Sequence, residues 1–127
     1  LEQGPEPSRR CLVIEDHVDA AESLALLLRL IGHEEEVAFD ATQGLDAARG
    51  FRPEVVLCDI GLPGALDGYG APRAFRADPE LRSAYLIALT GYGQEEDRRR
   101  ALEAGFDTHL TKPADLDALR RLLAGAG

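Results

Sequence analysis

Residues 55–64 read VVLCDIGLPG, a short apolar run that passes directly into Asp59. Such a run is typical of a strand buried on both faces of a parallel sheet. On either side of it, short apolar runs alternate with longer amphipathic segments. This alternation predicts an α/β fold. We expect its strands at residues 11–14, 36–39, 55–58, 85–89 and 108–110.

Helices should fill the gaps between these strands. The first begins near Asp19, where Glu22 is placed for a capping box, and Gly32 stops it. The second begins after Asp40, which can act as its N-cap, and ends at Gly50. For both helices, the capping residues agree with the spacing of the apolar residues that should face the sheet.

Three further helices complete the alternation. The third has about two turns, between Gly70 and Asp78. The fourth runs over residues 94–104, with acids in its first turn, and Gly105 ends it. The fifth begins at Asp115. Together the elements predict a flavodoxin-like, doubly wound (βα)5 three-layer sandwich, with a parallel five-stranded sheet in the order 2-1-3-4-5.

Composition and charge exclude several classes of function. The 127 residues fit one domain, and contents of 45% hydrophobic and 29% charged residues are ordinary for a soluble globular protein. The net charge of −9 would repel a phosphate backbone, so we expect no direct contact with nucleic acid. No apolar run has the length of a membrane span, so we expect no direct membrane contact. Cys11 and Cys58 lie in apolar runs, where we expect buried, reduced thiols and a cytoplasmic protein.

The N-terminal residues differ from the rest of the chain. Residues 1–9 are rich in proline, glycine and charge, and we expect them to be a linker or a remnant before a folded domain at residues 10–127. The sequence contains no methionine. We therefore expect it to be a processed or excised piece of a longer protein.

Acidic residues follow two strands that should be neighbours. The first strand passes into Glu15 and Asp16, and the third passes into Asp59. In the order 2-1-3-4-5, the carboxyl ends of these strands meet where ligands bind in such sheets. Converging carboxylates repel one another unless a cation lies between them, and Mg²⁺ suits oxygen ligands of this kind. For Glu15 and Asp16 alone, solvated loop acids are an equally good interpretation.

Two more polar residues end strands at the same edge of the sheet. Thr90 offers a hydroxyl group, with Gly91 leaving space beside it, and Lys112 offers an ammonium group. Pro113 leaves a cis peptide open as an alternative. Phosphoryl transfer to a carboxylate needs a metal, a cation and a small donor in position. We therefore predict a phosphoryl site with Asp59 as nucleophile; the alternative for Lys112 is a solvated surface lysine.

Four segments resemble the receiver domains of two-component response regulators and hybrid histidine kinases. They are LVIED at residues 12–16, VVLCDIGLPG at 55–64, ALTGYG at 88–93 and GFDTHLTKP at 105–113. The resemblance implies that Asp59 accepts a phosphoryl group from a histidine kinase or a histidine phosphotransfer domain. It also implies that Asp16, Asp59 and the backbone carbonyl of Gly61 bind Mg²⁺, with Glu15 acting through water. Lys112 would have the role of the family's conserved lysine, and Thr90 that of its switch threonine.

The same resemblance implies a signalling protein. Its chemistry would be its own phosphorylation and dephosphorylation, so we do not expect an enzyme in the ordinary sense. The fourth helix, fifth strand and fifth helix form the expected docking face for an output or effector protein. The C-terminal segments are similar to receivers of hybrid sensor histidine kinases, from which we expect the chain to derive; a stand-alone regulator is the alternative.

Three features depart from the family pattern. His109 stands where the family has its switch tyrosine or phenylalanine, which affects the coupling to Thr90. The loop around Ala65 has one residue more than usual, which affects its path. Gly61 has no side chain to steer or block hydrolytic water, so the lifetime of the phosphoryl group cannot be predicted from these residues.

Three other functions compete with this interpretation. A flavin-binding domain of the same topology needs a phosphate loop after the first strand, where Glu15 and Asp16 would repel the phosphate. An aspartate-nucleophile phosphatase needs an acid at the position of Gly61. A pseudo-receiver would keep the fold without phosphorylation, but the acids, hydroxyl and lysine of the site are all present.

Overall fold

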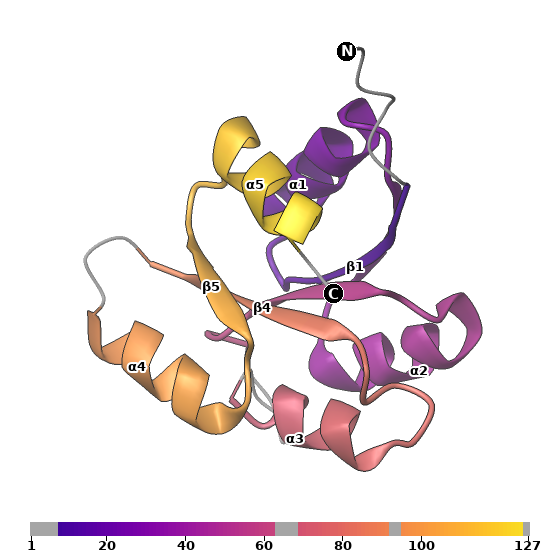
Figure 1. Ribbon diagram of the computed structural model, residues 1–127, viewed down its shortest axis with the longest axis vertical. Coiled ribbons are helices and arrows are strands. Elements are labelled where there is room, and N and C mark those ends of the chain that lie inside the picture. Colours follow the sequence, from indigo (N-terminus) through magenta and orange to yellow (C-terminus); the bar gives the residue numbers. More distant parts are fainter. Residues whose placement is uncertain (1–7, 63–68, 92–94, 126–127) are drawn as a thin grey trace.

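The computed structural model describes residues 8–62, 69–91 and 95–125. Its five strands form one parallel sheet in the order β2-β1-β3-β4-β5, which confirms the predicted topology (Figure 1). The register is regular, with Ile14 of β1 beside Cys58 of β3. The strands are β1 (Arg10–Ile14), β2 (Glu34–Ala38), β3 (Val55–Asp59), β4 (Tyr85–Thr90) and β5 (Thr108–Thr111).

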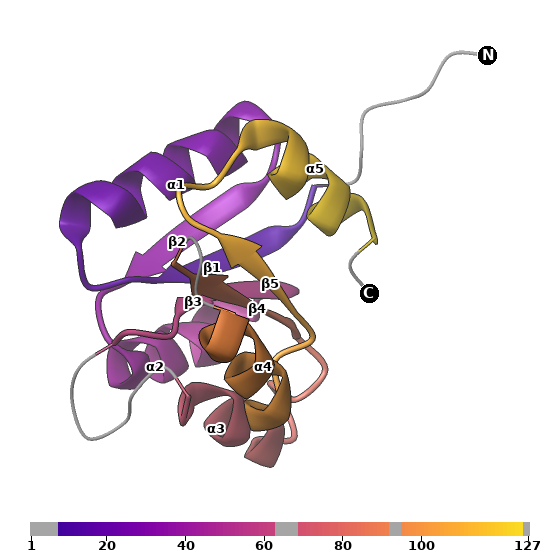
Figure 2. The ribbon, with the colours of Figure 1, turned by 90° about the vertical axis from the view of Figure 1, so that its left-hand side faces the viewer.

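Helices cover both faces of this sheet. The first and last helices lie on one face and the other three on the opposite face (Figure 2). Among the described residues, no helix is both long enough and apolar enough to cross a membrane. The helices are α1 (Val18–Leu30), α2 (Ala41–Phe51), α3 (Ala71–Ala77), α4 (Glu95–Ala104) and α5 (Leu116–Gly125).

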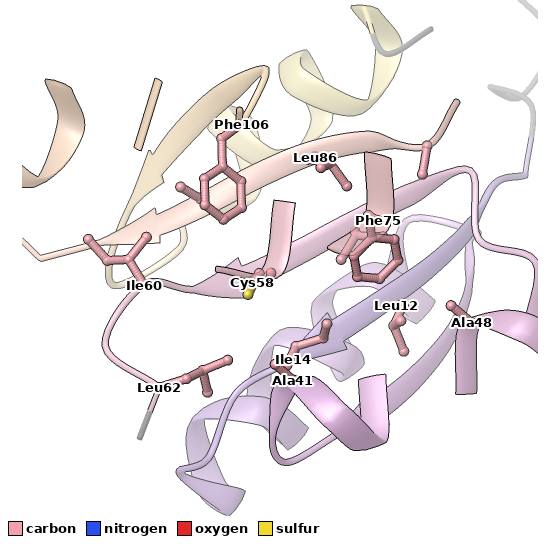
Figure 3. Close-up of a cluster of buried hydrophobic side chains, with 14 of the residues drawn as sticks. Leu12, Ile14, Ala41, Ala48, Cys58, Ile60, Leu62, Phe75, Leu86 and Phe106 are labelled. Carbon is pink, nitrogen blue, oxygen red and sulfur yellow. The ribbon is translucent and has the colours of Figure 1, made fainter. Parts of the chain in front are cut away.

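The core consists of two apolar layers, one on each face of the sheet. Consecutive strand residues alternate between them, so Leu12 contributes to the layer under α2 and α3 while Val13 contributes to the layer under α1 and α5. Figure 3 shows the first layer, in which Phe75 and Phe106 are the large rings. Because both faces of β3 are covered, every residue of this strand is buried. Residues 55–58 are therefore all apolar because each of them faces one of the two core layers.

The first helix starts earlier than its sequence signals predicted. His17 is the N-cap of α1, and its side chain makes no capping hydrogen bond within the described part of the chain. The predicted capping box of Asp19 and Glu22 is wrong, because Asp19 already lies inside the first helical turn. Three residues separate β1 from this helix, and among them the His17 N–H donates to Oε2 of Glu15 at 3.2 Å.

Strand β2 also begins two residues before the predicted start at residue 36. Glu34 pairs with Arg10 of β1, and its N–H donates to the Arg9 carbonyl at 3.0 Å. Backbone pairing at the sheet edge therefore decides this boundary. The apolar pattern could not show it, because Glu34 and Glu36 are exposed.

Helix α2 begins as predicted and ends later. Asp40 accepts a hydrogen bond from the Gln43 N–H at 2.7 Å, which confirms the N-cap. The predicted end at Gly50 is wrong, since the helix continues to Phe51 and Arg52 takes the left-handed conformation with φ 55°. The Arg52 carbonyl accepts from Nε of Arg10 at 2.8 Å, a tertiary contact that favours this later end.

Other helix boundaries agree with the sequence features that predicted them. Gly32 and Gly105 have φ of +95° and +118°, so both helix stops predicted there are confirmed. Helix α3 has seven residues, the predicted two turns. Asp115 accepts a hydrogen bond from the Asp117 N–H at 3.1 Å at the start of α5. The predicted linker up to residue 7, the loop near Ala65 and the predicted first residue of the fourth helix lie outside the described residues.

Candidate functional site

The sheet brings the predicted acids together at the carboxyl ends of β1 and β3. Asp59 is the last residue of β3, and Glu15 directly follows β1, which pairs with β3. The exposed fractions of the two residues are 2% for Glu15 and 6% for Asp59, while Asp16 is half-buried. Two carboxylates in a nearly water-free place repel each other strongly unless positive charge lies close by.

Lys112 supplies that positive charge. Its Nζ lies 3.2 Å from Oε1 of Glu15 and 3.4 Å from Oδ1 of Asp59. Burial lowers the pKa of Lys112, but the charges of Asp59 and Glu15 outweigh it, so the net shift of this pKa is upward. Lys112 is therefore a charged group paired with both carboxylates, which a lysine surrounded only by solvent would not be.

Glu15 shows the opposite balance. Burial raises the pKa of its carboxyl group, and the negative charge of Asp59 raises it further. The hydrogen bond from the His17 N–H and the charge of Lys112 act in the other direction without cancelling the shift. The carboxylate form of Glu15 is thus held in the site at a cost, which a bound cation would reduce.

Thr90 lies at the carboxyl end of β4, next to the end of β5. Thr90 is the last residue of β4 and is 2% exposed, and its carbonyl accepts a hydrogen bond from the Lys112 N–H at 2.8 Å. This bond ties the ends of β4 and β5 together. Gly91 follows Thr90 directly, and the peptide bond between Lys112 and Pro113 is cis, the alternative that the sequence left open.

Gly61 lies beside Asp59. Its N–H donates to Oδ1 of Asp59 at 3.0 Å. A Cβ atom added at Gly61 would lie 3.5 Å from the same oxygen, which is ordinary contact distance. The glycine therefore adds no side-chain atoms beside this carboxylate oxygen.

His109 lies apart from these contacts, on β5. It lines a groove of about 360 Å³ whose other walls include Asp115 and Arg121. Burial lowers the pKa of His109, the charge of Arg98 lowers it further, and Glu95 opposes the shift. The residue predicted at the switch position thus faces charges of α4 and lines a groove with residues of α5.

The sequence interpretation missed His17. Its Nδ1 lies 3.6 Å from Oε2 of Glu15 and 3.6 Å from Oδ1 of Asp16. Donor atoms of these three residues all lie within 4.8 Å of one another. An imidazole directly after two acids at the end of a strand was the signal available in the sequence. Oδ1 of Asp16 is buried and has no hydrogen-bond partner in the described part of the protein, which is unusual for a buried polar atom.

Comparison with protein families and sequences gives a consistent result. The response regulator receiver domain family matches residues 11–124. A 14.6 kDa protein of Leptolyngbya boryana is 35% identical over 112 residues, which cover 88% of this chain and 85% of that protein. The DNA-binding response regulator MtrA of Mycobacterium tuberculosis is 37% identical over 105 residues, which cover 83% of this chain and 44% of the regulator. The chain thus spans less than half the length of this DNA-binding relative.

Solved structures with the same fold include receiver domains of histidine kinases. One is the receiver domain of a sensor histidine kinase from Pseudomonas aeruginosa, with a magnesium ion coordinated in its active site cleft. Its TM-score is 0.84 and its sequence identity is 32%, and the match covers 94% of this chain and 98% of that chain. Another comes from a signal transduction histidine kinase of Syntrophus aciditrophicus, with TM-score 0.79 and 30% identity, over 93% and 92% of the two chains. The fold, the strand-end acids and these matches agree, and the chain belongs to the response regulator receiver domain family of two-component signalling.

Proposed function

We propose that this receiver domain accepts a phosphoryl group on Asp59 from a histidine kinase or a histidine phosphotransfer domain. The observation that carries the proposal is the position of the Lys112 ammonium between Asp59 and Glu15. Attack by a carboxylate oxygen on a phosphoryl group adds negative charge beside two acids that are already buried. A fixed ammonium at 3.4 Å from the nucleophile offsets that charge where it develops.

The site residues also fit Mg²⁺. We propose that Asp16, Asp59 and the carbonyl of Gly61 hold the ion, with Glu15 acting through water. Two observations support this assignment: the buried Oδ1 of Asp16 has no hydrogen-bond partner among the residues that the structure describes, and the pKa of Glu15 is raised. When bound, Mg²⁺ would neutralise charge on the phosphoryl oxygens and help to align them. The magnesium-bound receiver from Pseudomonas aeruginosa supports the choice of ion.

The other predicted residues have separate roles in the proposal. The Thr90 hydroxyl donates to a phosphoryl oxygen, and Gly91 and Pro113 shape the space around it. Movement of Thr90 is passed to His109 on the face formed by α4, β5 and α5, where an output or effector protein binds. The groove beside His109 supports this docking face.

We further propose that the domain at residues 10–127 comes from a hybrid sensor histidine kinase and works in the cytoplasm. Identities of 32% and 30% to receiver domains of histidine kinases, over more than nine tenths of this chain, support this origin. The similarity to MtrA favours the alternative of a separate response regulator. Transfer assays that compare a phosphotransfer domain with a kinase core as donor would separate the two.

The proposal is tested by exposing the protein to acetyl phosphate with and without Mg²⁺ and measuring the intact mass. We expect one phosphoryl group per chain, only with the metal present, and at least about a hundredfold less labelling for Asp59→Asn. Asp46→Asn, which removes an exposed acid on α2, is the control and should label like the wild type. Full labelling of a folded Asp59→Asn protein would show that the acceptor lies elsewhere.

A further inference from the structure

We infer that His17 is a further metal donor of this site, and that its imidazole makes the site favour transition ions such as Mn²⁺ over Mg²⁺. The inference rests on the proposed function, because it concerns the same cation. It assigns a role in ion selection to a residue outside the set that the family resemblance implies.

The geometry of three side chains carries the argument. Nδ1 of His17 is equidistant, at 3.6 Å, from Oε2 of Glu15 and Oδ1 of Asp16. These separations are too long for hydrogen bonds under ordinary criteria. Ligand atoms that share an ion at about 2.1 Å lie about 3 Å apart when adjacent and about 4.2 Å apart when opposite. The 3.6 Å between Nδ1 of His17 and Oδ1 of Asp16 falls between these values, so small side-chain movements would place both atoms on one ion, with Glu15 acting on it through water.

Two further observations make His17 available for this role. Oδ1 of Asp16 is buried without a hydrogen-bond partner among the described residues, so one oxygen of the cluster is ready for a cation. His17 stands at the N-cap of α1, yet no capping bond from its side chain is found in the described part of the structure. The side chain is 76% exposed and can turn toward the acids without disturbing the core.

The chemistry of the donors predicts the selectivity. Mg²⁺ prefers oxygen ligands and keeps several waters, so an imidazole adds little to its binding. Transition ions accept imidazole nitrogen readily, and their affinities for mixed nitrogen and oxygen sites exceed that for Mg²⁺. His17 should therefore strengthen the binding of Mn²⁺ selectively, whereas the carboxylates of Glu15 and Asp16 strengthen the binding of both ions.

The test measures Mn²⁺ binding by the loss of the free-ion EPR signal, and Mg²⁺ binding by competition with Mn²⁺, at one fixed pH. For His17→Asn we expect about tenfold weaker binding of Mn²⁺ and a change of less than about twofold for Mg²⁺. Asp19→Asn is the matched control, because it removes an exposed charge from the same helix turn. It should weaken the binding of both ions by the same factor.

Pulsed EPR of the Mn²⁺-bound wild-type chain gives a direct readout. We expect modulation from an imidazole nitrogen, and its loss in His17→Asn. Equal effects of His17→Asn on both ions, or the absence of this modulation, would overturn the inference. If that happens while Mn²⁺ binds and Asp59 is still phosphorylated, the proposed function stands and only the role of His17 fails. If neither ion binds the wild-type protein, the metal site itself is wrong.

Discussion

The Nζ atom of Lys112 lies 3.4 Å from Oδ1 of Asp59, although the two residues come from the ends of different strands. The same ammonium lies 3.2 Å from Oε1 of Glu15, so one cation serves two buried carboxylates. The Lys112 side chain is 35% exposed, which leaves it room to follow charge that moves onto a phosphoryl group. The same ammonium group that offsets the charges of the two carboxylates would therefore offset the charge of the phosphoryl group in the proposed reaction.

Replacement of Lys112 by arginine should separate metal binding from signal output. The guanidinium keeps the positive charge but is planar, larger and more dispersed than an ammonium between two acids. We expect Lys112→Arg to bind Mg²⁺ within a few fold of the wild type and to show weaker phosphorylation-dependent changes in the NMR signals of Thr90 and His109. Arg120→Lys, an exposed change on α5, is the control. If Lys112→Arg shows the same changes in these NMR signals as the wild type, the ammonium group is not needed for signal output.

Glu15 should make the metal-free protein less stable at high pH. Its raised pKa means that the folded state favours the protonated carboxyl group. The stabilisation of the folded state by this protonated group is therefore complete below the usual pKa of 4.5. That contribution is lost as the pH rises through the folded-state pKa. We expect Glu15→Gln, measured by urea unfolding in EDTA, to be more stable than the wild type at pH 7.5, with a smaller difference at pH 4.5. A less stable variant at pH 7.5 would contradict the assigned shift.

A methyl group at Gly44 should disturb the packing of α2 on β1. An added Cβ would overlap Cδ1 of Ile14 and lie 2.9 Å from its Cγ1. The better helix propensity of alanine gives about 1 kcal/mol, whereas overpacking costs about 1–3 kcal/mol. We therefore expect Gly44→Ala to lower the free energy of unfolding by up to about 2 kcal/mol.

Two variants check that steric cause. Gly50→Ala lies in the same helix with no atom within 4 Å of the added Cβ, so it should be neutral or stabilising by up to about 1 kcal/mol. Ile14→Val removes Cδ1 and should recover part of the loss when combined with Gly44→Ala. Equal effects of the two alanine substitutions would exclude the clash.

Arg76 should be a stabilising residue far from the proposed phosphoryl site. Its guanidinium donates to the carbonyls of Arg82 and Ala84 and to Oδ2 of Asp107, at 2.6, 2.9 and 2.8 Å. A lysine has no forked set of donors for these partners. We expect Arg76→Lys to cost about 1–3 kcal/mol in chemical unfolding, while Arg73→Lys on the exposed face of α3 changes little. Labelling of Asp59 should be unaffected in Arg76→Lys.

Much of the fold could be predicted from local signals. The alternation of apolar runs with amphipathic segments indicated the parallel sheet, and the stops at Gly32 and Gly105 were visible because a positive φ favours glycine. The predictions failed where tertiary contacts decide a boundary. Pairing with Arg10 extends β2 over exposed glutamates, and a contact to the Arg52 carbonyl accompanies the extension of α2 past Gly50.

The sequence by itself determined which residues end the strands, because strands of a parallel sheet run the same way and expose their carboxyl ends at one edge. This led to the prediction that Asp59, Thr90 and Lys112 lie near one another, and the structure gives 3.4 Å between Nζ of Lys112 and Oδ1 of Asp59. Only the tertiary structure decided that Lys112 lies between Asp59 and Glu15, that Glu15 is buried, and that Nδ1 of His17 lies 3.6 Å from oxygens of both neighbouring acids. Those features depend on side-chain directions and on the exclusion of water, which arise when distant segments pack and leave no trace in local sequence pattern.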